Sequence, residues 1–275
     1  MDSEKEAIMT TFQGGAAPLS SAGFEQARQS LEVDPESLWA LITVETSGFG
    51  FLPDRRPKIL FERHVFHRRT GGRYAAHADI SAPAAGGYLG GDAEYARLER
   101  AMELDRQAAL DSASWGLGQI MGYHATALGY PGAEAMVARF SEGEDEQLAG
   151  AQRFISANPP LRQAFAQKNW NRVAFYYNGA AYARHGYHRR LESFHDLYEL
   201  KGTPSITVRM AQAWLTYLGY RPRGIDGILG PGTGMALIEF QKARRLSVTA
   251  EPDDATLEQL RLAVANGGAE GARPS

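Results

Sequence analysis

Apolar residues recur three and four positions apart along most of the chain, which predicts a mainly α-helical protein. The clearest helical segment is residues 33–48. Asp34 can cap its N-terminus, Pro35 suits the first helical position, and Gly48 supplies a stop. An apolar stripe occupies three positions of this segment: Leu38, Leu41 and Ile42. Glu45 is the next position on that stripe, so the pattern predicts a helix whose last turn carries a carboxyl group on its apolar side.

The same spacing predicts further helices, separated by glycine and proline breaks. We expect one from Ser20 or Ser21 to about Leu31, and one that begins at Asp92. The second helix should turn four side chains inward: Tyr95, Leu98, Met102 and Leu110. Other helices are predicted at residues 145–157, 161–167, 170–177, 189–199, 206–218, 232–245 and 254–263. Strand signals are few and short, and residues 114–122 are expected to form a glycine-rich turn that leads into a helix.

Two domains are expected from the 275 residues. Residues 201–205 are the best linker, between a large domain at 1–200 and a small three-helix module at 206–263. The small and polar residues 264–275 are expected to be a disordered tail. The core of the module should contain six apolar side chains: Leu215, Leu218, Ile228, Leu237, Phe240 and Leu257.

Composition excludes several classes of protein. The chain has no cysteine, which removes disulfides, thiol catalysis and cysteine-bound zinc. Its net charge of −3 gives no reason to expect nucleic acid as a partner. No apolar run approaches the roughly 20 residues that span a bilayer, so membrane insertion is not expected. The first residues lack the features of a signal peptide, so we expect that any action outside the cytoplasm depends on another route of export.

The position of Glu45 suggests acid chemistry. Apolar surroundings and the negative end of a helix dipole both disfavour the ionised carboxylate. A carboxyl group that stays protonated near neutral pH can donate a proton to a leaving oxygen. The alternative is that Glu45 only marks the edge of the stripe and faces solvent.

Three segments in order give Glu45 a context: residues 44–48 (VETSG), 114–121 (SWGLGQIM) and 175–179 (FYYNG). Their order resembles the lysozyme-like superfamily, which includes lytic transglycosylases and goose-type lysozymes. Residues 57–64 (PKILFERH) and 112–122 make the chain more similar to the phage endolysin N-acetylmuramidase family, over roughly residues 20–200. The resemblance implies cleavage of the β-1,4 bond after N-acetylmuramic acid, with Glu45 as the catalytic glutamate.

The resemblance also implies a set of residues around the glycan: Ser114, Gly116, Gln119, Tyr177 and Asn178. Gly116 would let the backbone approach a sugar. Gln119 and Asn178 offer amides for acetamido or hydroxyl groups, and Tyr177 offers an aromatic face. The simpler alternative is an ordinary turn before a helix for Gly116 and a core aromatic for Tyr177.

Glu62 is the best candidate for a second carboxylate, although it could instead pair with Arg63 or organise the groove. A separation of about 5 Å between carboxyl groups indicates a nucleophile, and about 6.5–9.5 Å leaves room for an activated water. If Glu45 acts alone, attack by the muramic C6 hydroxyl, as in a lytic transglycosylase, becomes plausible. A non-catalytic wall-binding protein is the third alternative.

Histidines are frequent but do not form a metal-binding motif. His64 and His67 are three residues apart, as are His185 and His188, yet no His-Glu-x-x-His pattern occurs. We therefore expect no metal and no other cofactor.

Residues 206–262 resemble the type 1 peptidoglycan-binding domain. The resemblance is carried by a turn, a helix start and a helix, and its main residues are Asp226, Gly227, Gly230, Thr233, Phe240 and Gln241. Arg245 replaces the usual glycine after the Phe-Gln helix. The resemblance implies that the module binds bacterial peptidoglycan, and we expect the chain to be a monomer.

Overall fold

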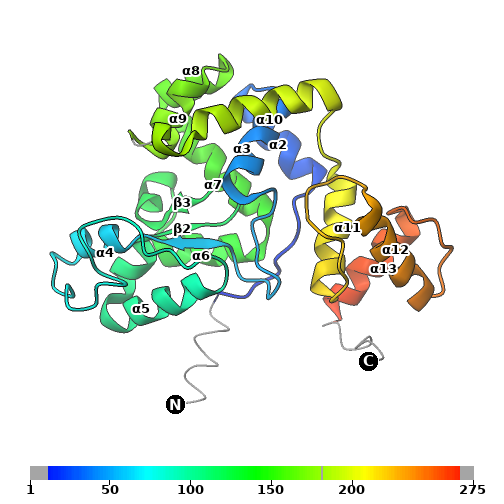
Figure 1. The fold of residues 1–275 in the computed structure, drawn as a ribbon, viewed down its shortest axis with the longest axis horizontal. Coiled ribbons are helices and arrows are strands. Elements are labelled where there is room, and N and C mark those ends of the chain that lie inside the picture. Colours follow the sequence, from blue (N-terminus) through cyan, green and yellow to red (C-terminus); the bar gives the residue numbers. More distant parts are fainter. Residues whose placement is uncertain (1–11, 181, 267–275) are drawn as a thin grey trace.

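The computed structural model describes residues 12–180 and 182–266, and this part of the chain is mainly helical, as predicted (Figure 1). A small antiparallel sheet has the order β1-β2-β3, with β1 at Ile59–Phe61, β2 at Ala113–Trp115 and β3 at Ile120–Met121. The helices of the large part are α2 (Ser21–Leu31), α3 (Pro35–Thr46), α4 (Arg63–Arg69), α5 (Ala93–Asp111), α6 (Ala133–Glu142), α7 (Glu144–Ser156), α8 (Pro159–Ala166), α9 (Trp170–Asn178) and α10 (Tyr187–Lys201). Short 3₁₀ turns are η1 (Gly122–His124), η2 (Thr126–Leu128) and η3 (Tyr182–His185), and the C-terminal helices are α11 (Ile206–Tyr217), α12 (Pro231–Ala243) and α13 (Asp254–Ala265).

Helix α3 begins as the sequence predicts. The Asp34 carboxylate accepts a 2.7 Å hydrogen bond from the backbone N–H of Ser37, and Pro35 is the first helical residue. The helix is buried on all sides, because every residue from Ser37 to Ile42 is at most 2% exposed. Helix α10 packs along it, and the hydroxyls of Thr43 and Tyr198 lie 2.8 Å apart. Glu45 is therefore carried into the interior by an enclosed helix.

The large part has two neighbouring hydrophobic cores. One surrounds the sheet, α5 and α6, and includes the buried ring of Trp115. The other surrounds α2, α3 and the helices α8 to α10, and includes Trp39. Phe154 and Tyr177 pack against both cores. Glu45 lies at the end of α3, where the two cores meet.

The predicted helices occur with ends that differ by one or two residues, and the four inward residues of α5 are all buried. The segment 114–122 is different, because it forms β2, a turn and β3 rather than the start of a helix. Trp115 pairs with Ile120 across the sheet, and both side chains are buried. Gly116 and Gln119 make the turn with positive φ angles of 67° and 48°.

Helices α11, α12 and α13 pack around a core of their own. Leu215, Leu237 and Phe240 are fully buried in it. The prediction that Ile228 belongs to this core is wrong, since its side chain is 60% exposed. Its backbone faces inward instead, because the carbonyl accepts from Gln212 and the N–H donates to Asp226.

The predicted disordered tail also begins too early. Helix α13 continues through Ala265, and Val264 is buried in the core of the module. Residues 267–275 lie outside the described part of the chain.

The module packs directly against the large part. Helix α10 runs through Lys201, so the connection to α11 is only residues 202–205, and Pro204 in it is buried. Arg209 of α11 makes two hydrogen bonds, at 2.6 and 2.5 Å, with the carboxylate of Glu144, and both side chains are fully buried. Arg209 also donates to the carbonyl of Gly48 at 2.6 Å. The same contact surface contains a small apolar cluster of Ala16, Phe49, Phe51 and Ala213.

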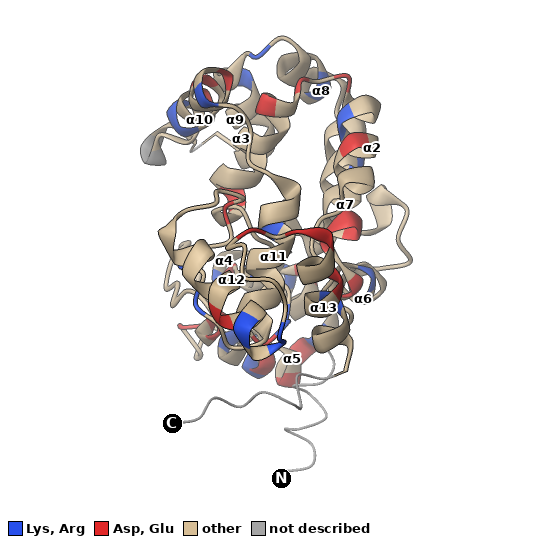
Figure 2. Ribbon diagram, turned by 90° about the vertical axis from the view of Figure 1, so that its right-hand side faces the viewer, with Lys and Arg blue, Asp and Glu red and all other residues tan. Residues whose placement is uncertain are grey.

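Charges of both signs are spread over the helices, as Figure 2 shows. No helix in the described ranges has the length and hydropathy that crossing a membrane requires.

Candidate active site

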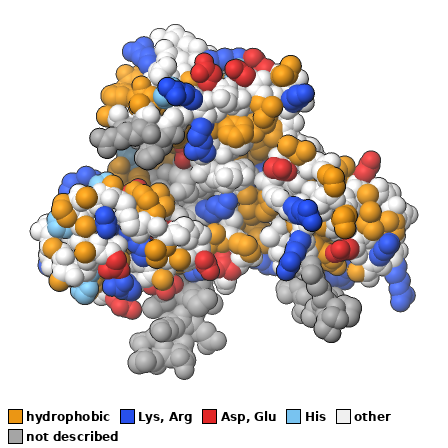
Figure 3. All heavy atoms as spheres, viewed as in Figure 1, with side chains coloured by type: hydrophobic (Ala, Val, Ile, Leu, Met, Phe, Trp, Pro, Cys, Tyr) orange, Lys and Arg blue, Asp and Glu red, His pale blue; other side chains and the backbone are white. Residues whose placement is uncertain are grey.

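Glu45 lies in the last turn of α3 and is partly exposed to a cavity of about 320 Å³. Its neighbours on the cavity wall come from the end of α3, from β1 and from three connecting segments: Thr46, Ser47, Leu52, Lys58, Ile59, Leu60, Gly90, Gly91 and Gln119. Figure 3 shows that the face toward the viewer is hollowed between the upper, lower-left and right-hand parts of the molecule. The structure thus brings the predicted acid and the predicted Gln119 to one cavity.

Burial raises the pKa of Glu45 from 4.5 to about 7. Two groups of α10 work against burial, because the Tyr187 hydroxyl donates a hydrogen bond to the carboxylate and Arg190 is a nearby positive charge. Arg190 is held by its own 2.9 Å hydrogen bond to the carbonyl of Val44. The result is a carboxyl group that can both hold and release a proton near neutral pH.

The structure therefore adds Tyr187 and Arg190 to the site. No local pattern identified them, because they contact α3 only through the packing of α10.

Lys58 is a further residue that the motifs did not single out. Its ammonium donates a 2.9 Å hydrogen bond to the carbonyl of Thr46, one of the unpaired carbonyls at the end of α3. Burial lowers the pKa of Lys58. The residue fixes the end of the helix that carries Glu45 and also lines the cavity.

Ser114, Gly116 and Gln119 form a connected turn. The Ser114 hydroxyl donates to the side-chain oxygen of Gln119 at 2.8 Å, and the Gln119 amide donates to the carbonyl of Gly116 at 2.9 Å. A side chain at Gly116 would collide with Gln147, since a Cβ there would lie 2.6 Å from it. Gly116 thus permits packing inside the protein, and Gln119 is the member of this group that faces the cavity.

Tyr177 and Asn178 end helix α9. The Tyr177 hydroxyl donates to the carbonyl of Gly118 at 2.7 Å, and its ring packs edge-on against Phe154. Tyr177 is partly buried, whereas Asn178 is exposed. The tyrosine therefore ties α9 to the turn that carries Gln119, and the asparagine amide is accessible.

Glu62 is held by partners other than Arg63. The Tyr88 hydroxyl lies 3.1 and 2.9 Å from its two carboxylate oxygens, and Nδ1 of His64 lies 3.1 Å from one of them. Arg63 instead donates to backbone carbonyls, including that of Ala84 at 2.9 Å. Burial and the charge of Glu62 raise the pKa of Tyr88 to about 12. Glu62 is not among the residues that line the cavity of Glu45.

A buried ion pair supports the cavity wall. Glu94 of α5 is fully buried and pairs with Arg97 at 2.8 Å. Its carboxylate also accepts from the backbone N–H groups of Phe61, Leu89 and Gly90. The pair fastens β1 and the loop that carries Gly90 to α5.

One group of described residues has ligand atoms close enough for a metal ion: His195, Asp196 and Glu199. The ammonium of Lys168 lies beside this group, 3.3 Å from the Glu199 carboxylate and 3.1 Å from the Asp34 carboxylate. The arrangement is that of an ion-pair cluster at the start of α3.

The predicted residues of the module are mostly structural. Thr233, Phe240 and Gln241 are buried, and the Gln241 amide bonds Thr249, Thr256 and the carbonyl of Glu251. Gly227 has a φ of 75° and its N–H donates to Gln212. Gly230 caps α12, and Asp226 is exposed.

A mainly helical fold that places a glutamate with a raised pKa at the edge of a cavity fits a lysozyme-like glycosidase. The model of the N-acetylmuramidase family matches residues 34–199, which is more than half of the chain. The chain therefore belongs to the N-acetylmuramidase family. A second model, for a peptidoglycan binding domain, matches residues 205–260.

Among solved structures, the crystal structure of a Burkholderia AP3 phage endolysin is similar, with 41% sequence identity and a TM-score of 0.60. The similarity covers 66% of this chain and 71% of that one. No curated protein matches the chain significantly.

Proposed function

We propose that this chain is an endolysin that hydrolyses the β-1,4 bond between N-acetylmuramic acid and N-acetylglucosamine, with Glu45 as the general acid. The observation that carries the proposal is the carboxyl group with a pKa of about 7 in a cavity between two cores. Membership of the N-acetylmuramidase family and the similarity to a phage endolysin support it.

The reaction begins when Glu45 donates its proton to the glycosidic oxygen and the bond to C1 of N-acetylmuramic acid breaks. The carboxylate that remains is stabilised by the Tyr187 hydroxyl and by the charge of Arg190. Both groups lie on α10, so the proton donor belongs to α3 and the groups that stabilise its carboxylate belong to α10.

The second half of the reaction needs a nucleophile. In the proposed hydrolysis, Glu62 positions or activates the water that attacks C1, and the hydrogen bonds from the Tyr88 hydroxyl hold its carboxylate in place. The alternative needs no part from Glu62: the muramic C6 hydroxyl attacks C1, its proton returns to the Glu45 carboxylate, and a 1,6-anhydro end forms.

Sugar contacts are assigned to two amides. Gln119 lines the cavity and is oriented by Ser114, and Asn178 is exposed at the end of α9. Gly116 and Tyr177 shape the turn and the helix end that carry these amides.

The proposal includes the two-domain division at residues 201–205 and a monomer that acts on the cell wall after synthesis in a bacterial host. The match to a peptidoglycan binding domain supports wall targeting by α11, α12 and α13.

The test is the substitution Glu45→Gln with Glu36→Gln as the control. Both residues lie on α3, but Glu36 is in its first turn. We expect Glu45→Gln to abolish the release of fragments from purified peptidoglycan while circular dichroism stays unchanged, and Glu36→Gln to retain activity. Mass spectrometry of the products identifies the reaction, because reducing muramic ends mean hydrolysis and 1,6-anhydro ends mean transglycosylation. Activity of the Glu45→Gln protein would contradict the assignment.

A further inference from the structure

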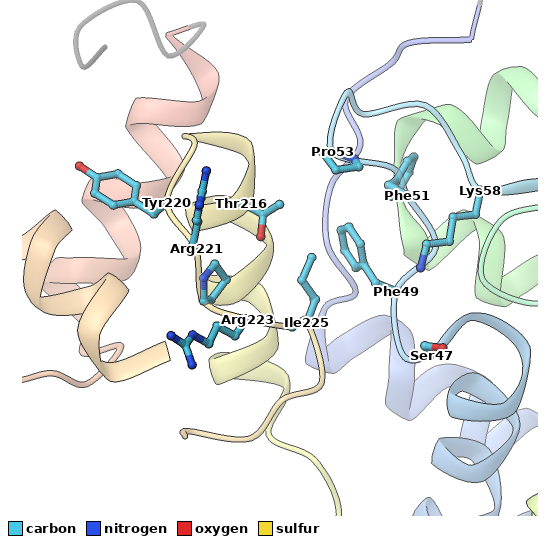
Figure 4. Close-up of a pocket in the computed structure, with 12 residues that line it drawn as sticks. Ser47, Phe49, Phe51, Pro53, Lys58, Thr216, Tyr220, Arg221, Arg223 and Ile225 are labelled. Carbon is cyan, nitrogen blue, oxygen red and sulfur yellow. The ribbon is translucent and has the colours of Figure 1, made fainter. Parts of the chain in front are cut away.

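A second cavity, of about 420 Å³, lies where the module meets the large part (Figure 4). We call it the interdomain cleft. The large part contributes Ser47, Phe49, Phe51, Pro53 and Lys58, and the module contributes Thr216 and residues 220–225. In Figure 4 the side chains of Phe49 and Ile225 approach each other from opposite walls. Its volume is within the range of sites for small organic groups.

The interdomain cleft adjoins the cavity of Glu45. Ser47 and Lys58 line both cavities. Ser47 is the C-cap of α3 and follows the proton donor by two residues, and Lys58 bonds the carbonyl of Thr46, the residue next to Glu45. The two cavities therefore share part of their walls.

The described residues that line the cleft include three cations and no acid. The cations are Lys58 on one wall and Arg221 and Arg223 on the other, and both arginines are exposed. Among the described residues, no carboxylate forms an ion pair with any of the three. Three neighbouring acids are engaged elsewhere. Asp226 accepts from Gln212 at 2.8 Å, Asp54 pairs with Arg56 at 2.7 Å, and Glu144, whose charge acts on Lys58, pairs with Arg209 at 2.5 Å.

The base of the cleft is apolar. The ring centres of Phe49 and Phe51 lie 6.0 Å apart with the rings tilted by 57°, and Ile225 packs against the same cluster. A group that fits this surface combines carboxylates for the cations with small apolar side chains for the base. Peptidoglycan carries such a group, because each N-acetylmuramic acid can bear a short peptide stem rich in alanine and with free carboxylates.

We propose that the interdomain cleft binds the anionic peptide stem of the glycan strand whose sugars lie at Glu45. The inference rests on the proposed function and deepens it. The site needs residues from both matched regions, 34–199 and 205–260, so it belongs to the joined chain and to neither part alone. It makes the module a contributor to substrate recognition beside the point of cleavage.

The test uses the full chain and the double variant Arg221→Gln/Arg223→Gln. The substrates are soluble glycan strands with their stems and the same strands stripped by an amidase. We expect kcat/KM on stem-bearing strands to fall about three- to tenfold, which is the loss expected when two partly exposed ion pairs with the stem are removed. The kcat/KM on stripped strands should not change. Added salt should reduce the preference of the unaltered protein for stem-bearing strands.

The matched control is Lys242→Gln/Arg245→Gln, which removes the same charge from exposed positions of the module that do not line the cleft. It should leave both rates unchanged. Equal losses on the two substrates, or no loss on stem-bearing strands, would overturn the role of the cleft.

Binding of labelled stem-bearing strands to Glu45→Gln protein separates this inference from the proposed function. We expect Glu45→Gln protein to bind the stem-bearing strand, and the triple variant that also replaces Arg221 and Arg223 to bind it more weakly. That result supports stem binding by the cleft even if the reaction is assigned incorrectly. Binding that is indifferent to the two arginines, or equal for a stripped strand, contradicts it.

Discussion

At the residue scale, the proton affinity of Glu45 is set by opposing effects. Burial favours the protonated form, and the Tyr187 hydroxyl and the Arg190 charge favour the carboxylate. Burial is the larger effect, which leaves the pKa at about 7. A general acid must be protonated to act, so activity should be lost as the pH rises through this value.

Removing one of the two donors should shift that alkaline limit. The substitution Tyr187→Phe deletes the hydroxyl that stabilises the carboxylate, so the pKa of Glu45 should rise further. We expect the alkaline limb of the kcat/KM profile to move upward by about one pH unit. The measurement is cleavage of soluble glycan strands across the pH range.

Tyr198→Phe is the matched control, because its hydroxyl bonds Thr43 on the same helix pair but not Glu45. The alkaline limb of the kcat/KM profile of Tyr198→Phe should stay at the same pH as in the unaltered protein. An unchanged limb in Tyr187→Phe would show that the hydroxyl has no part in tuning the acid.

The same carboxyl group should affect stability. Its pKa is raised in the folded state, so the folded protein binds the proton more tightly and loses stability as the pH rises from about 4.5 to about 7. Glu45→Gln should therefore be more stable than the unaltered protein at pH 8, by about 1–3 kcal/mol, and equally stable at pH 4. Urea unfolding at the two pH values measures this, and a difference that does not depend on pH would refute it.

Glu45 itself could be predicted from the sequence because cap, stripe and stop lie within 16 consecutive residues, 33–48. Tyr187 could not, because it is 142 residues away and only the packing of α10 on α3 brings it near. The partners of Glu62 escaped prediction for a similar reason. Arg63 is the adjacent charge in the sequence and so the expected partner of Glu62, but its side chain donates to the carbonyls of a loop. The Tyr88 hydroxyl bonds the Glu62 carboxylate instead.

At the element scale, α5 holds the cavity wall through a single carboxylate. Glu94 is bonded to β1, to the loop at residues 89–90 and to Arg97. Glu94→Ala leaves Arg97 buried without its ion-pair partner, which should cost about 3–5 kcal/mol. The backbone N–H groups of Leu89 and Gly90 should then exchange with deuterium faster.

Glu103→Ala is the comparison, since it removes an exposed carboxylate from the same helix. Its effect on unfolding should stay within about 0.5 kcal/mol. A similar, small effect of Glu94→Ala would mean that the network does not fasten the loop.

The helices were predictable because their apolar spacing persists over several turns. The strand β3 was not, because Ile120–Met121 has only two residues and two residues establish no period. The side chain of Ile228 was assigned to the core on hydrophobicity alone, but the hydrogen bonds of its backbone decide its direction.

At the scale of the whole molecule, the buried pair of Arg209 and Glu144 joins the two parts. Glu144 also accepts from the backbone of Leu19 and Gly50, so the pair is bonded on all sides. Arg209→Met leaves a buried carboxylate without its cation and should destabilise the protein by about 3–5 kcal/mol. Adding Glu144→Gln should recover part of the loss, because no buried charge then remains unpaired.

Calorimetry is the measurement. We expect one transition for the unaltered protein, because the two parts share a buried interface, and two for Arg209→Met. Two transitions in the unaltered protein would show that the parts unfold independently.

The sequence indicated the boundary near residues 201–205 from its small and polar composition, but composition does not reveal whether a connection is a tether. Residues that dock the module, such as Arg209 and Phe49, lie outside the connection and far from each other in the chain. Deleting residues 201–275 would therefore remove more than wall binding, because it also exposes Phe49 and leaves Glu144 unpaired.

The interlocked Arg209 and Glu144 have a consequence for engineering. A lytic enzyme with separate catalytic and wall-binding parts can be engineered by exchanging its wall-binding part for another, so that it attacks different bacteria. In this chain a foreign unit would have to bring a guanidinium to Glu144 and an apolar face to Phe49 and Phe51. Chimeras that carry over α11 of the present chain should fold and keep the end of α3 in place, whereas those joined at residue 202 should not.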